Sequence, residues 1–139
     1  MAIWSTDKCT GGTASASSVY LSEAQYNADK AFDDNESTYW HANEGVPAWI
    51  KYDFGVSVTW DIEKLRIYPR FNAGHAYCNA FTLHGSNDDS DWDLLLSDTA
   101  ADTDAWKDYI FSNSTAYRYY KLTATSSHIG TWVSFYEIE

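Results

Sequence analysis

The stretch Lys30-Ala31-Phe32-Asp33-Asp34-Asn35-Glu36-Ser37-Thr38-Tyr39-Trp40-His41 carries more information about this protein than any other part of the chain. Its middle is a short polar turn that offers side-chain oxygens from Asp33, Asn35 and Thr38. Hard cations such as calcium are bound by several oxygens at once, from carboxylates, amides, hydroxyls and backbone carbonyls. The turn leads directly into two large aromatic residues and a histidine. The stretch therefore predicts a metal-held loop followed by a side chain that can hydrogen-bond a ligand; an Asx-type turn without an ion is the alternative.

On both sides of this stretch, short segments alternate apolar and polar residues with period two. Their apolar members are Ile50, Tyr52 and Phe54; Leu65 and Ile67; Phe81 and Leu83; Tyr120, Leu122 and Ala124; and Val133 and Phe135. Polar turn clusters such as Asn43-Glu44-Gly45 and Asn72-Ala73-Gly74 separate the segments. Only Ala24 to Phe32 has a helical pattern, for a turn or two. Many short alternating strands with turns between them predict one antiparallel all-β domain, a sandwich or barrel, over residues 1–139.

Charge and composition narrow the classes of partner. The chain has 20 Asp and Glu against 9 Lys and Arg, which gives a formal net charge of −11. Such a chain repels phosphate backbones and anionic lipid headgroups, so we expect neither nucleic acid nor an acidic membrane as a partner. No apolar run of about 18 residues is present, so membrane insertion is not expected. No signal peptide is visible in the first residues, Met1 to Ser5.

The sequence holds no motif that argues for catalysis. The metalloprotease, nucleophile-elbow, phosphate-loop and Cys-x-x-Cys patterns do not occur, and carboxylates are too numerous to nominate a glycosidase pair. Asp89-Ser90-Asp91-Trp92-Asp93 starts like an EF-hand loop, but Leu94 and Ala100 occupy the positions of its Gly and its bidentate Glu. We therefore predict a hairpin tip there and a non-catalytic protein. Cys9 and Cys78 could form a disulfide, although two cysteines alone do not decide this.

Six motifs follow one another along the chain in a characteristic order and spacing. They are Asp33 to Trp40, Trp49-Ile50-Lys51-Tyr52-Asp53-Phe54-Gly55, Ile67-Tyr68-Pro69-Arg70, Gly85-Ser86-Asn87-Asp88 followed by Trp92, Tyr117-Arg118-Tyr119-Tyr120-Lys121-Leu122, and Glu137-Ile138. This order resembles the discoidin, or coagulation factor 5/8 type C, domains, and within them the family 32 carbohydrate-binding modules. The resemblance spans about Ala14 to Glu139. It implies a jelly-roll β-sandwich of the galactose-binding-domain type, in agreement with the alternating segments.

The resemblance also implies a structural calcium ion, which in that family joins the loop after the first strands to the C-terminal strand. It places on the metal the side-chain oxygens of Asp33, Thr38 and Glu137, and backbone carbonyls from near Lys30, Asn35, Thr38 and Tyr136. Two carboxylates with several neutral oxygens suit calcium. Asp34 departs from the pattern, because the family usually has Gly there. Asp can adopt a positive φ at that position at modest cost.

A sugar site on loops at one end of the sandwich is implied in the same way. The candidate residues are His41 and Arg70, which would hydrogen-bond sugar hydroxyls, Glu23, Asn72 and Asn79, which would add polar contacts, and Tyr77 or Trp132, which would provide an aromatic platform. Other roles remain open: Arg70 could pair with a carboxylate, His41 could cap the calcium loop, and Trp132 could be core. Trp40, Trp49 and Phe54 are assigned to packing.

These observations lead to a non-catalytic, lectin-like module that binds terminal galactose- or N-acetylgalactosamine-type glycans with low affinity. We expect it to act outside the cell or on a cell or virion surface, and it could belong to a larger surface protein. A protein-binding or assembly module, such as an adhesin or phage tail component, is the main alternative. A phosphatidylserine-binding discoidin domain is a third, and the net charge of −11 counts against it.

Overall fold

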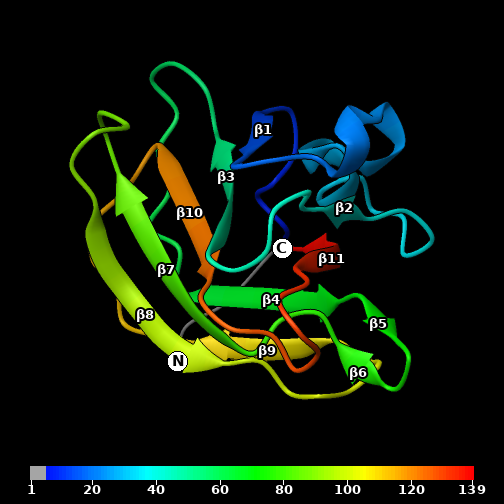
Figure 1. Cartoon of the computed structure of the whole chain (residues 1–139). Coiled ribbons are helices and arrows are strands. Elements are labelled where there is room, and N and C mark those ends of the chain that lie inside the picture. Colours follow the sequence, from blue (N-terminus) through cyan, green and yellow to red (C-terminus); the bar gives the residue numbers. More distant parts are fainter. Residues whose placement is uncertain (1–5) are drawn as a thin grey trace.

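The computed structural model describes residues 6–139, and the N-terminal Met1 to Ser5 lies outside them. The chain forms an antiparallel β-sandwich of the jelly-roll type (Figure 1). Its strands are β1 (Thr13–Ala16), β2 (Trp40–His41), β3 (Ala48–Asp53), β4 (Lys64–Pro69), β5 (Phe71–Asn72), β6 (His75–Ala76), β7 (Ala80–Ser86), β8 (Asp93–Thr99), β9 (Lys107–Ile110), β10 (Tyr119–Ala124) and β11 (Ser134–Ile138). Three short 3-10 helices lie between β1 and β2, namely η1 (Tyr20–Ser22), η2 (Ala24–Tyr26) and η3 (Ala28–Ala31).

Within residues 6–139 the strands form two main layers. One is a five-stranded sheet in the order β1-β3-β10-β7-β8, and the other is a four-stranded sheet in the order β2-β11-β4-β9. The strands within both sheets pair antiparallel, and β5 and β6 form a separate hairpin. Figure 1 shows β2, the 3-10 helices and the β5–β6 hairpin on the right-hand side of the molecule. Strand ends and loops from distant parts of the sequence therefore meet at this side.

The period-two alternation of the sequence corresponds to the core. Strands β3, β4 and β10 alternate strictly between buried and partly exposed residues, and β7 does so up to its last residue. The apolar members predicted to point inward, from Ile50 to Ala124, are all at most 8 % exposed. The ring of Trp40 is fully buried and stacks on that of Phe135, with 5.9 Å between centroids and 8° between planes. The prediction of an all-β sandwich is confirmed.

Two local predictions differ from the structure. The helical pattern of Ala24 to Phe32 gives two 3-10 turns instead of one helix, because the extended backbone of Asn27 (φ −61°, ψ 160°) interrupts it. The last alternating segment begins later than expected: β11 starts at Ser134, and Val133 is buried just before it. A register shift between Phe135 and Glu137 interrupts the alternation of β11, where Ser134, Phe135 and Glu137 are all buried.

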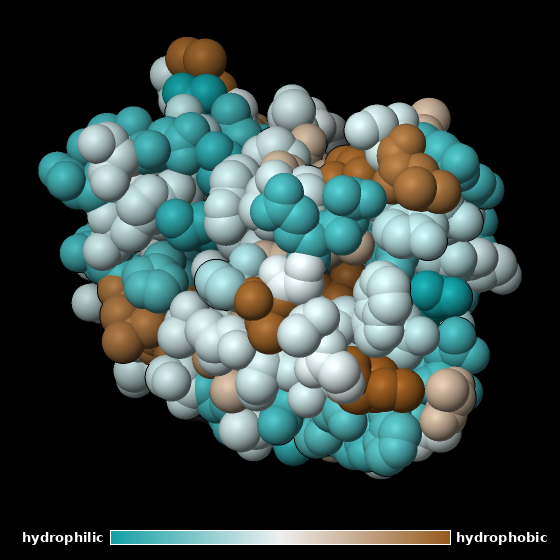
Figure 2. Space-filling model, viewed as in Figure 1, coloured by the Kyte–Doolittle hydropathy of each residue, from teal (hydrophilic) through white to brown (hydrophobic). Residues whose placement is uncertain are grey.

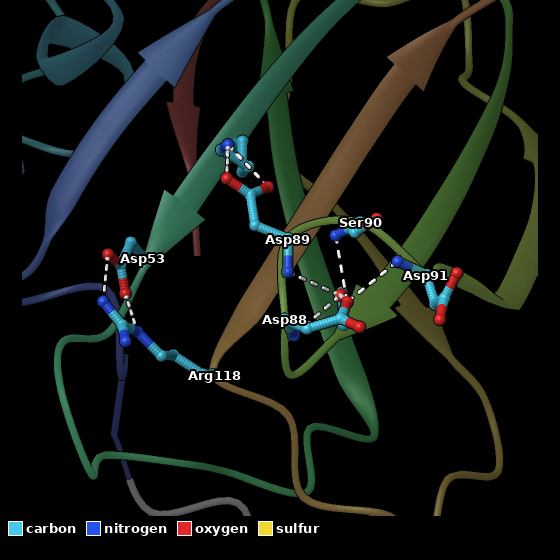
Figure 3. Close-up of polar contacts among 8 residues, drawn as sticks. Asp53, Asp88, Asp89, Ser90, Asp91 and Arg118 are labelled. Atoms are coloured by element: carbon cyan, nitrogen blue, oxygen red, sulfur yellow. Dashed lines mark hydrogen bonds and ion pairs between the residues drawn. The ribbon is translucent and has the colours of Figure 1, made fainter.

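The loop between β7 and β8 is the predicted hairpin tip. The Asp88 carboxylate accepts hydrogen bonds from the backbone N–H groups of Ser90 (2.9 Å) and Asp91 (2.8 Å) and from the Ser86 hydroxyl (3.0 Å) (Figure 3). These bonds stabilise the ionised form, so the pKa of Asp88 is lowered. Asp88 stands directly before the apparent EF-hand motif, and the carboxylate of Asp89, which begins the motif, forms an ion pair with Lys51 (2.7 Å).

Cys9 and Cys78 are free thiols, so the disulfide that the sequence left open is not formed. Cys78 is fully buried, and burial raises the pKa of its thiol to about 12. Burial also raises the pKa of Cys9. Both groups are therefore unreactive, un-ionised thiols at neutral pH.

The surface is predominantly polar on the face drawn in Figure 2, where hydrophilic residues dominate and apolar residues lie in small separate groups. None of the helices in residues 6–139 has the length and apolar character needed to cross a bilayer.

Candidate functional site

Seven side chains line a hollow of about 200 Å³ next to β2. They are Tyr20, Tyr26, Tyr39, His41, Arg70, Tyr77 and Trp132. We call this site the aromatic hollow, because five of its residues are tyrosine or tryptophan. Its lining contains no carboxylate and no side-chain amide. The site can therefore stack against a ring and donate hydrogen bonds from a guanidinium, an indole and several hydroxyl groups.

Backbone hydrogen bonds around Ser134 hold three parts of the hollow together. Ser134 on β11 pairs with His41 on β2, which fixes the imidazole relative to the C-terminal strand. The carbonyl of Ser134 accepts from the N–H of Arg70 (3.1 Å), and its N–H donates to the carbonyl of Tyr77 (3.3 Å). Tyr77 in turn donates to the carbonyl of Arg70 (2.9 Å). His41, Arg70 and Tyr77 are thus positioned by rigid backbone, which favours a preformed site.

The loop that carries Tyr20 is fastened to β2 and the turn after it. The Trp40 indole N–H donates to the carbonyl of Ser18 (3.0 Å), and the Ser18 hydroxyl accepts from the N–H of Asn43 (3.1 Å). The N–H of Leu21 donates to the Asn43 side chain (3.1 Å). Leu21 and Ser22 both have left-handed backbone, with φ of 52° and 56°. Strained backbone of this kind costs free energy and is frequent at functional sites.

His41 is the most buried polar group of the hollow, at 5 % exposed. Its imidazole stacks on the ring of Trp132 (5.5 Å between centroids, 24° between planes) and lies 4.8 Å from that of Tyr20. The Nδ1 atom has no hydrogen-bond partner among residues 6–139. Burial, and then the charge of Arg70, lower the pKa of His41 to about 4. At neutral pH the imidazole is therefore uncharged; Nδ1 is closed off from solvent, so a ligand can meet only the part of the ring that lines the hollow.

Arg70 packs its guanidinium against two tyrosine rings, at 4.2 Å from the centroid of Tyr39 and 5.2 Å from that of Tyr77. In the part of the chain that the structure describes, its side chain makes no hydrogen bond and no ion pair. The pairing with a carboxylate that the sequence left open is thus not formed. Its N–H donors are free for a bound molecule.

The remaining predicted sugar contacts divide into two groups. Trp132 is 44 % exposed and Tyr77 is buried at 7 %, and both line the hollow, so Trp132 is not core. Asn72 lies at the rim, where its amide donates to the Tyr77 hydroxyl (3.2 Å). Glu23 is exposed, accepts a hydrogen bond from Gln25, and does not line the hollow.

Asn79 also lies outside the lining. Its backbone N–H donates to the carbonyl of Ser126 (2.8 Å), and its carbonyl accepts from the N–H of Ala100 (2.8 Å). These contacts tie the start of β7 to two neighbouring loops, which is a structural role.

Three members of the hollow were missed from the sequence, namely Tyr20, Tyr26 and Tyr39. For Tyr39 a signal was present: Trp40 points into the core, so in extended chain its neighbours Tyr39 and His41 share the opposite side. Tyr20 and Tyr26 lie on 3-10 turns, and no local pattern shows which way their rings point.

A second group of polar residues gathers in the quoted stretch and at β11. The Thr38 hydroxyl lies 2.9 and 2.8 Å from the two carboxylate oxygens of Asp33, and 2.9 Å from the carbonyl of Asn35. The N–H of Asn35 donates to both Asp33 (3.1 Å) and Glu137 (3.2 Å). We call Asp33, Asn35, Thr38 and Glu137 the acidic loop. The N–H groups of Ser37 and Thr38 donate to the oxygens of Asn35 (3.0 and 3.1 Å), so few donors remain for the carboxylates of Asp33 and Glu137.

The charge balance of the acidic loop is also incomplete. Glu137 is 1 % exposed, and within residues 6–139 neither its carboxylate nor that of Asp33 forms an ion pair. Burial, and then the neighbouring Asp33, raise the pKa of Glu137 well above its ordinary value. Two unneutralised carboxylates with a hydroxyl and a carbonyl oxygen form a donor set that fits a calcium ion. Lys30 on η3 and Tyr136 on β11 flank this group, and their carbonyls stay predicted ligands.

Asp34, the departure noted in the sequence, has a φ of 57°, so this position does require left-handed backbone. Its carboxylate faces away from the four residues above and lies with those of Asp7 and Glu139, each within 4.8 Å of the others. Glu139 already forms an ion pair with Arg66.

A larger cavity of about 630 Å³ shares no lining residue with the aromatic hollow. Its inner wall is made by core side chains such as Ile50, Leu83 and Leu122. Its charged residues Arg66 and Asp108 pair with each other at 3.0 Å. The exposed ring in its lining, that of Trp60, is covered by the ammonium group of Lys8 (4.3 Å from the ring centroid).

The sequence of the chain matches a known domain family. A model of the F5/8 type C domain matches residues 13–138. The chain belongs to this family. A comparison with curated protein sequences finds no match.

Solved structures of this family share the fold over almost the whole chain. A family 32 module from Clostridium perfringens in complex with GalNAc-β-1,3-galactose has a TM-score of 0.82 and 24 % identity, covering 94 % of this chain and 95 % of that one. A second chitosan-binding module from a Paenibacillus chitosanase/glucanase, in complex with chitotriose, has a TM-score of 0.80 and 25 % identity, covering 96 % and 98 %. The family 32 module of AlyQ, in complex with 4,5-unsaturated mannuronic acid, has a TM-score of 0.73 and 24 % identity, covering 91 % of each.

Proposed function

We propose that this chain is a non-catalytic carbohydrate-binding module, and that its aromatic hollow binds a terminal galactose-type sugar. The observation that carries the proposal is the meeting, in one hollow, of the uncharged imidazole of His41, an Arg70 side chain without an ion pair in residues 6–139 and the exposed ring of Trp132. The guanidinium gains hydrogen-bond acceptors when a sugar binds, which favours the complex. The carbohydrate ligands of the solved neighbours support the same class of partner.

The three side chains have distinct roles in this proposal. The exposed ring of Trp132 stacks on the apolar face of a pyranose. Neutral His41 bonds a hydroxyl that points toward the hollow, such as the axial hydroxyl of galactose. Arg70 donates to further oxygens. With one stack and few hydrogen bonds, we expect a dissociation constant on the order of 0.1–1 mM.

We also propose a structural calcium ion in the acidic loop, held by Asp33, Asn35, Thr38 and Glu137 with carbonyls from near Lys30 and Tyr136. The ion would neutralise the two facing carboxylates. It would also join the loop before β2 to the C-terminal strand, which closes about a hundred residues of chain. Since Tyr39 and His41 directly follow this loop, the ion would hold one wall of the aromatic hollow in place.

A module of such low affinity fits a location outside the cell or on a cell or virion surface, where several copies act together. Linked sites raise the overall affinity without any new contact. In one solved neighbour, truncated AlyQ, a family 32 module and an alginate lyase domain share a chain. We infer that this chain likewise works within a larger surface protein or assembly.

The test is a glycan array, probed with and without a calcium chelator. The variant Arg70→Ala should lose at least tenfold in binding to terminal galactose-type sugars while keeping its melting temperature, because the side chain of Arg70 makes no hydrogen bond or ion pair in residues 6–139 and the variant keeps its backbone hydrogen bonds. Arg118→Ala is the matched control: it removes an arginine that pairs with Asp53 outside the hollow, so binding should persist. A blank array from folded protein would instead favour a protein-binding or assembly module.

A further inference from the structure

Arg70 is exceptional among the arginines of this chain. The chain has three, and the other two find carboxylates: Arg66 pairs with Asp108 (3.0 Å) and Glu139, and Arg118 donates two bonds to Asp53, at 2.7 and 2.9 Å (Figure 3). Acidic residues outnumber basic ones by 20 to 9, so a free arginine would readily find a partner here. The side chain of Arg70 nevertheless has neither a hydrogen bond nor an ion pair within residues 6–139. It lies instead in a hollow that has no carboxylate in its lining.

The hollow offers an excess of donors over acceptors. A guanidinium has five N–H donors and no acceptor, and the indole of Trp132 can only donate. The strong acceptors that usually bind sugar hydroxyls, carboxylates and amide oxygens, are absent from the lining. The amide of Asn72, outside the lining, already has partners at both ends: it gives an N–H to the Tyr77 hydroxyl (3.2 Å), and its oxygen accepts from the N–H of Ala73 (3.0 Å). A neutral sugar, whose hydroxyls also need acceptors, would satisfy this lining incompletely.

The surroundings of Arg70 narrow the choice further. Its guanidinium carbon lies 4.2 Å from the ring centroid of Tyr39 and 5.2 Å from that of Tyr77, so its neighbours in the hollow are aromatic rings and not hydrogen-bond acceptors of its N–H groups. The N–H groups lie in the plane of the guanidinium, and their usual partner is a carboxylate that accepts two parallel bonds. The buried imidazole beside it is uncharged at neutral pH and does not compete for an anion.

We infer that the terminal sugar this hollow selects is an acidic one, a galactose-type uronic acid whose carboxylate is bound by the unpaired Arg70. The inference rests on the proposed function and specifies its ligand. The net charge of −11 opposes an anion only at long range, and a Debye length of about 8 Å at physiological ionic strength screens most of that repulsion. A direct contact with Arg70 is not screened in this way.

Three ligands of nearly equal shape test the inference by calorimetry or NMR titration in calcium: methyl galactoside, methyl galacturonoside and the methyl ester of the latter. We expect the acid to bind at least tenfold more tightly than the ester and the neutral galactoside. In Arg70→Gln this preference should disappear, while Arg70→Lys should retain part of it. Trp132→Ala should weaken all three ligands by a similar factor and preserve their ranking. This control separates stacking from charge recognition.

The outcomes separate this inference from the proposed function. Equal binding of the three ligands would overturn the acidic preference and leave the sugar site in place. A preference for the acid that persists in Arg70→Gln would also overturn it, because the carboxylate would then be bound by another group. If none of the three ligands bound to protein shown to be folded and calcium-loaded, both proposals would fail.

Discussion

The acidic loop and the aromatic hollow lie next to each other in sequence and are incomplete in opposite ways. In the loop, the oxygens of Asp33, Thr38 and Glu137 outnumber the hydrogen-bond donors around them. In the hollow, the donors of Arg70 have no acceptor within residues 6–139. In the functions proposed above, a cation completes the first site and a ligand rich in hydrogen-bond acceptors completes the second. The charges left unpaired in a folded chain thus indicate what each site binds.

The same physical cause acts on both sites in opposite directions. Burial disfavours the charged form of any group. It therefore raises the pKa of the Glu137 carboxyl in the loop and lowers the pKa of the His41 imidazole in the hollow. A bound cation would restore the charge of Glu137, whereas His41 functions as a neutral hydrogen-bonding group. Four predictions test this contrast.

The largest effect should come from removing calcium. At a thousandfold excess of calcium over its dissociation constant, binding should stabilise the wild-type fold by about 4 kcal/mol, and a chelator should remove this. Glu137→Gln should abolish the response to chelator. It should also be no less stable than wild type in chelator, because it removes one of two facing carboxylates. Thermal unfolding with and without chelator measures both effects.

The control for this experiment is Glu36→Gln, in the same stretch of chain. Glu36 is exposed and accepts a hydrogen bond from the Trp106 indole (2.7 Å), which glutamine can also accept. This variant should keep the full response to chelator. If wild type itself did not respond, the acidic loop would hold no calcium and the first half of the contrast would be lost.

Lowering the pH should destabilise the fold, because His41 in the aromatic hollow takes up a proton less readily than in the unfolded chain. The pKa of His41 is lowered to about 4 in the folded state, below an unfolded value of about 6.5. The unfolded chain therefore binds the proton first, so this contribution to stability is present above pH 6.5 and is lost as the pH falls toward 4. The loss should reach about 3 kcal/mol at pH 4.

Carboxylates titrate in the same range, so the informative quantity is the difference between wild type and His41→Gln. Denaturant unfolding at several pH values should show a shallower decline in the variant between pH 6.5 and 4. Parallel curves for the two proteins would show that His41 is not held neutral by burial.

A smaller effect should follow from removing the exposed ring. Trp132→Ala should weaken sugar binding about tenfold, or about 1.4 kcal/mol, and change the free energy of unfolding little because the ring is 44 % exposed. Trp40→Ala is the contrast: its fully buried ring stacks on Phe135, so its loss should cost roughly 3–5 kcal/mol of stability. A large stability loss in Trp132→Ala would make that ring part of the fold.

The sequence predicted the core better than the site, for a physical reason. Alternation is local, and it identified Ile50, Leu122 and their neighbours because one face of each strand must be buried. The acidic loop could also be predicted from the sequence, because Asp33, Asn35 and Thr38 lie within six residues and only Glu137 is distant.

The hollow depends on contacts that no local pattern encodes. Its walls meet because Ser134 pairs with His41, 93 positions apart in the chain, and hydrogen-bonds Arg70 and Tyr77. The resemblance to a known family supplied His41 and Arg70, but it also suggested Glu23 and Asn79, which lie outside the lining. The positions of the Tyr20 and Tyr26 rings depend on the hydrogen bonds that hold the strained loop in place. These bonds form only in the tertiary structure.

The smallest effect tests where the acidic loop ends. Asp34 has a φ of 57°. Glycine at this position would relieve backbone strain in the folded state, but it would also increase the conformational entropy of the unfolded chain. Because these effects oppose each other, Asp34→Gly should change the free energy of unfolding by less than about 1 kcal/mol. Without divalent cations the change should be stabilising: burial, and then the charges of Glu139 and Asp34, raise the pKa of the nearby Asp7 carboxyl, and the variant removes one of these two repulsions. Calcium titrations followed by thermal unfolding measure this. If Asp34→Gly instead weakened stabilisation by calcium, the carboxylates of Asp7, Asp34 and Glu139 would belong to the cation site, and the loop would extend beyond the four residues assigned to it.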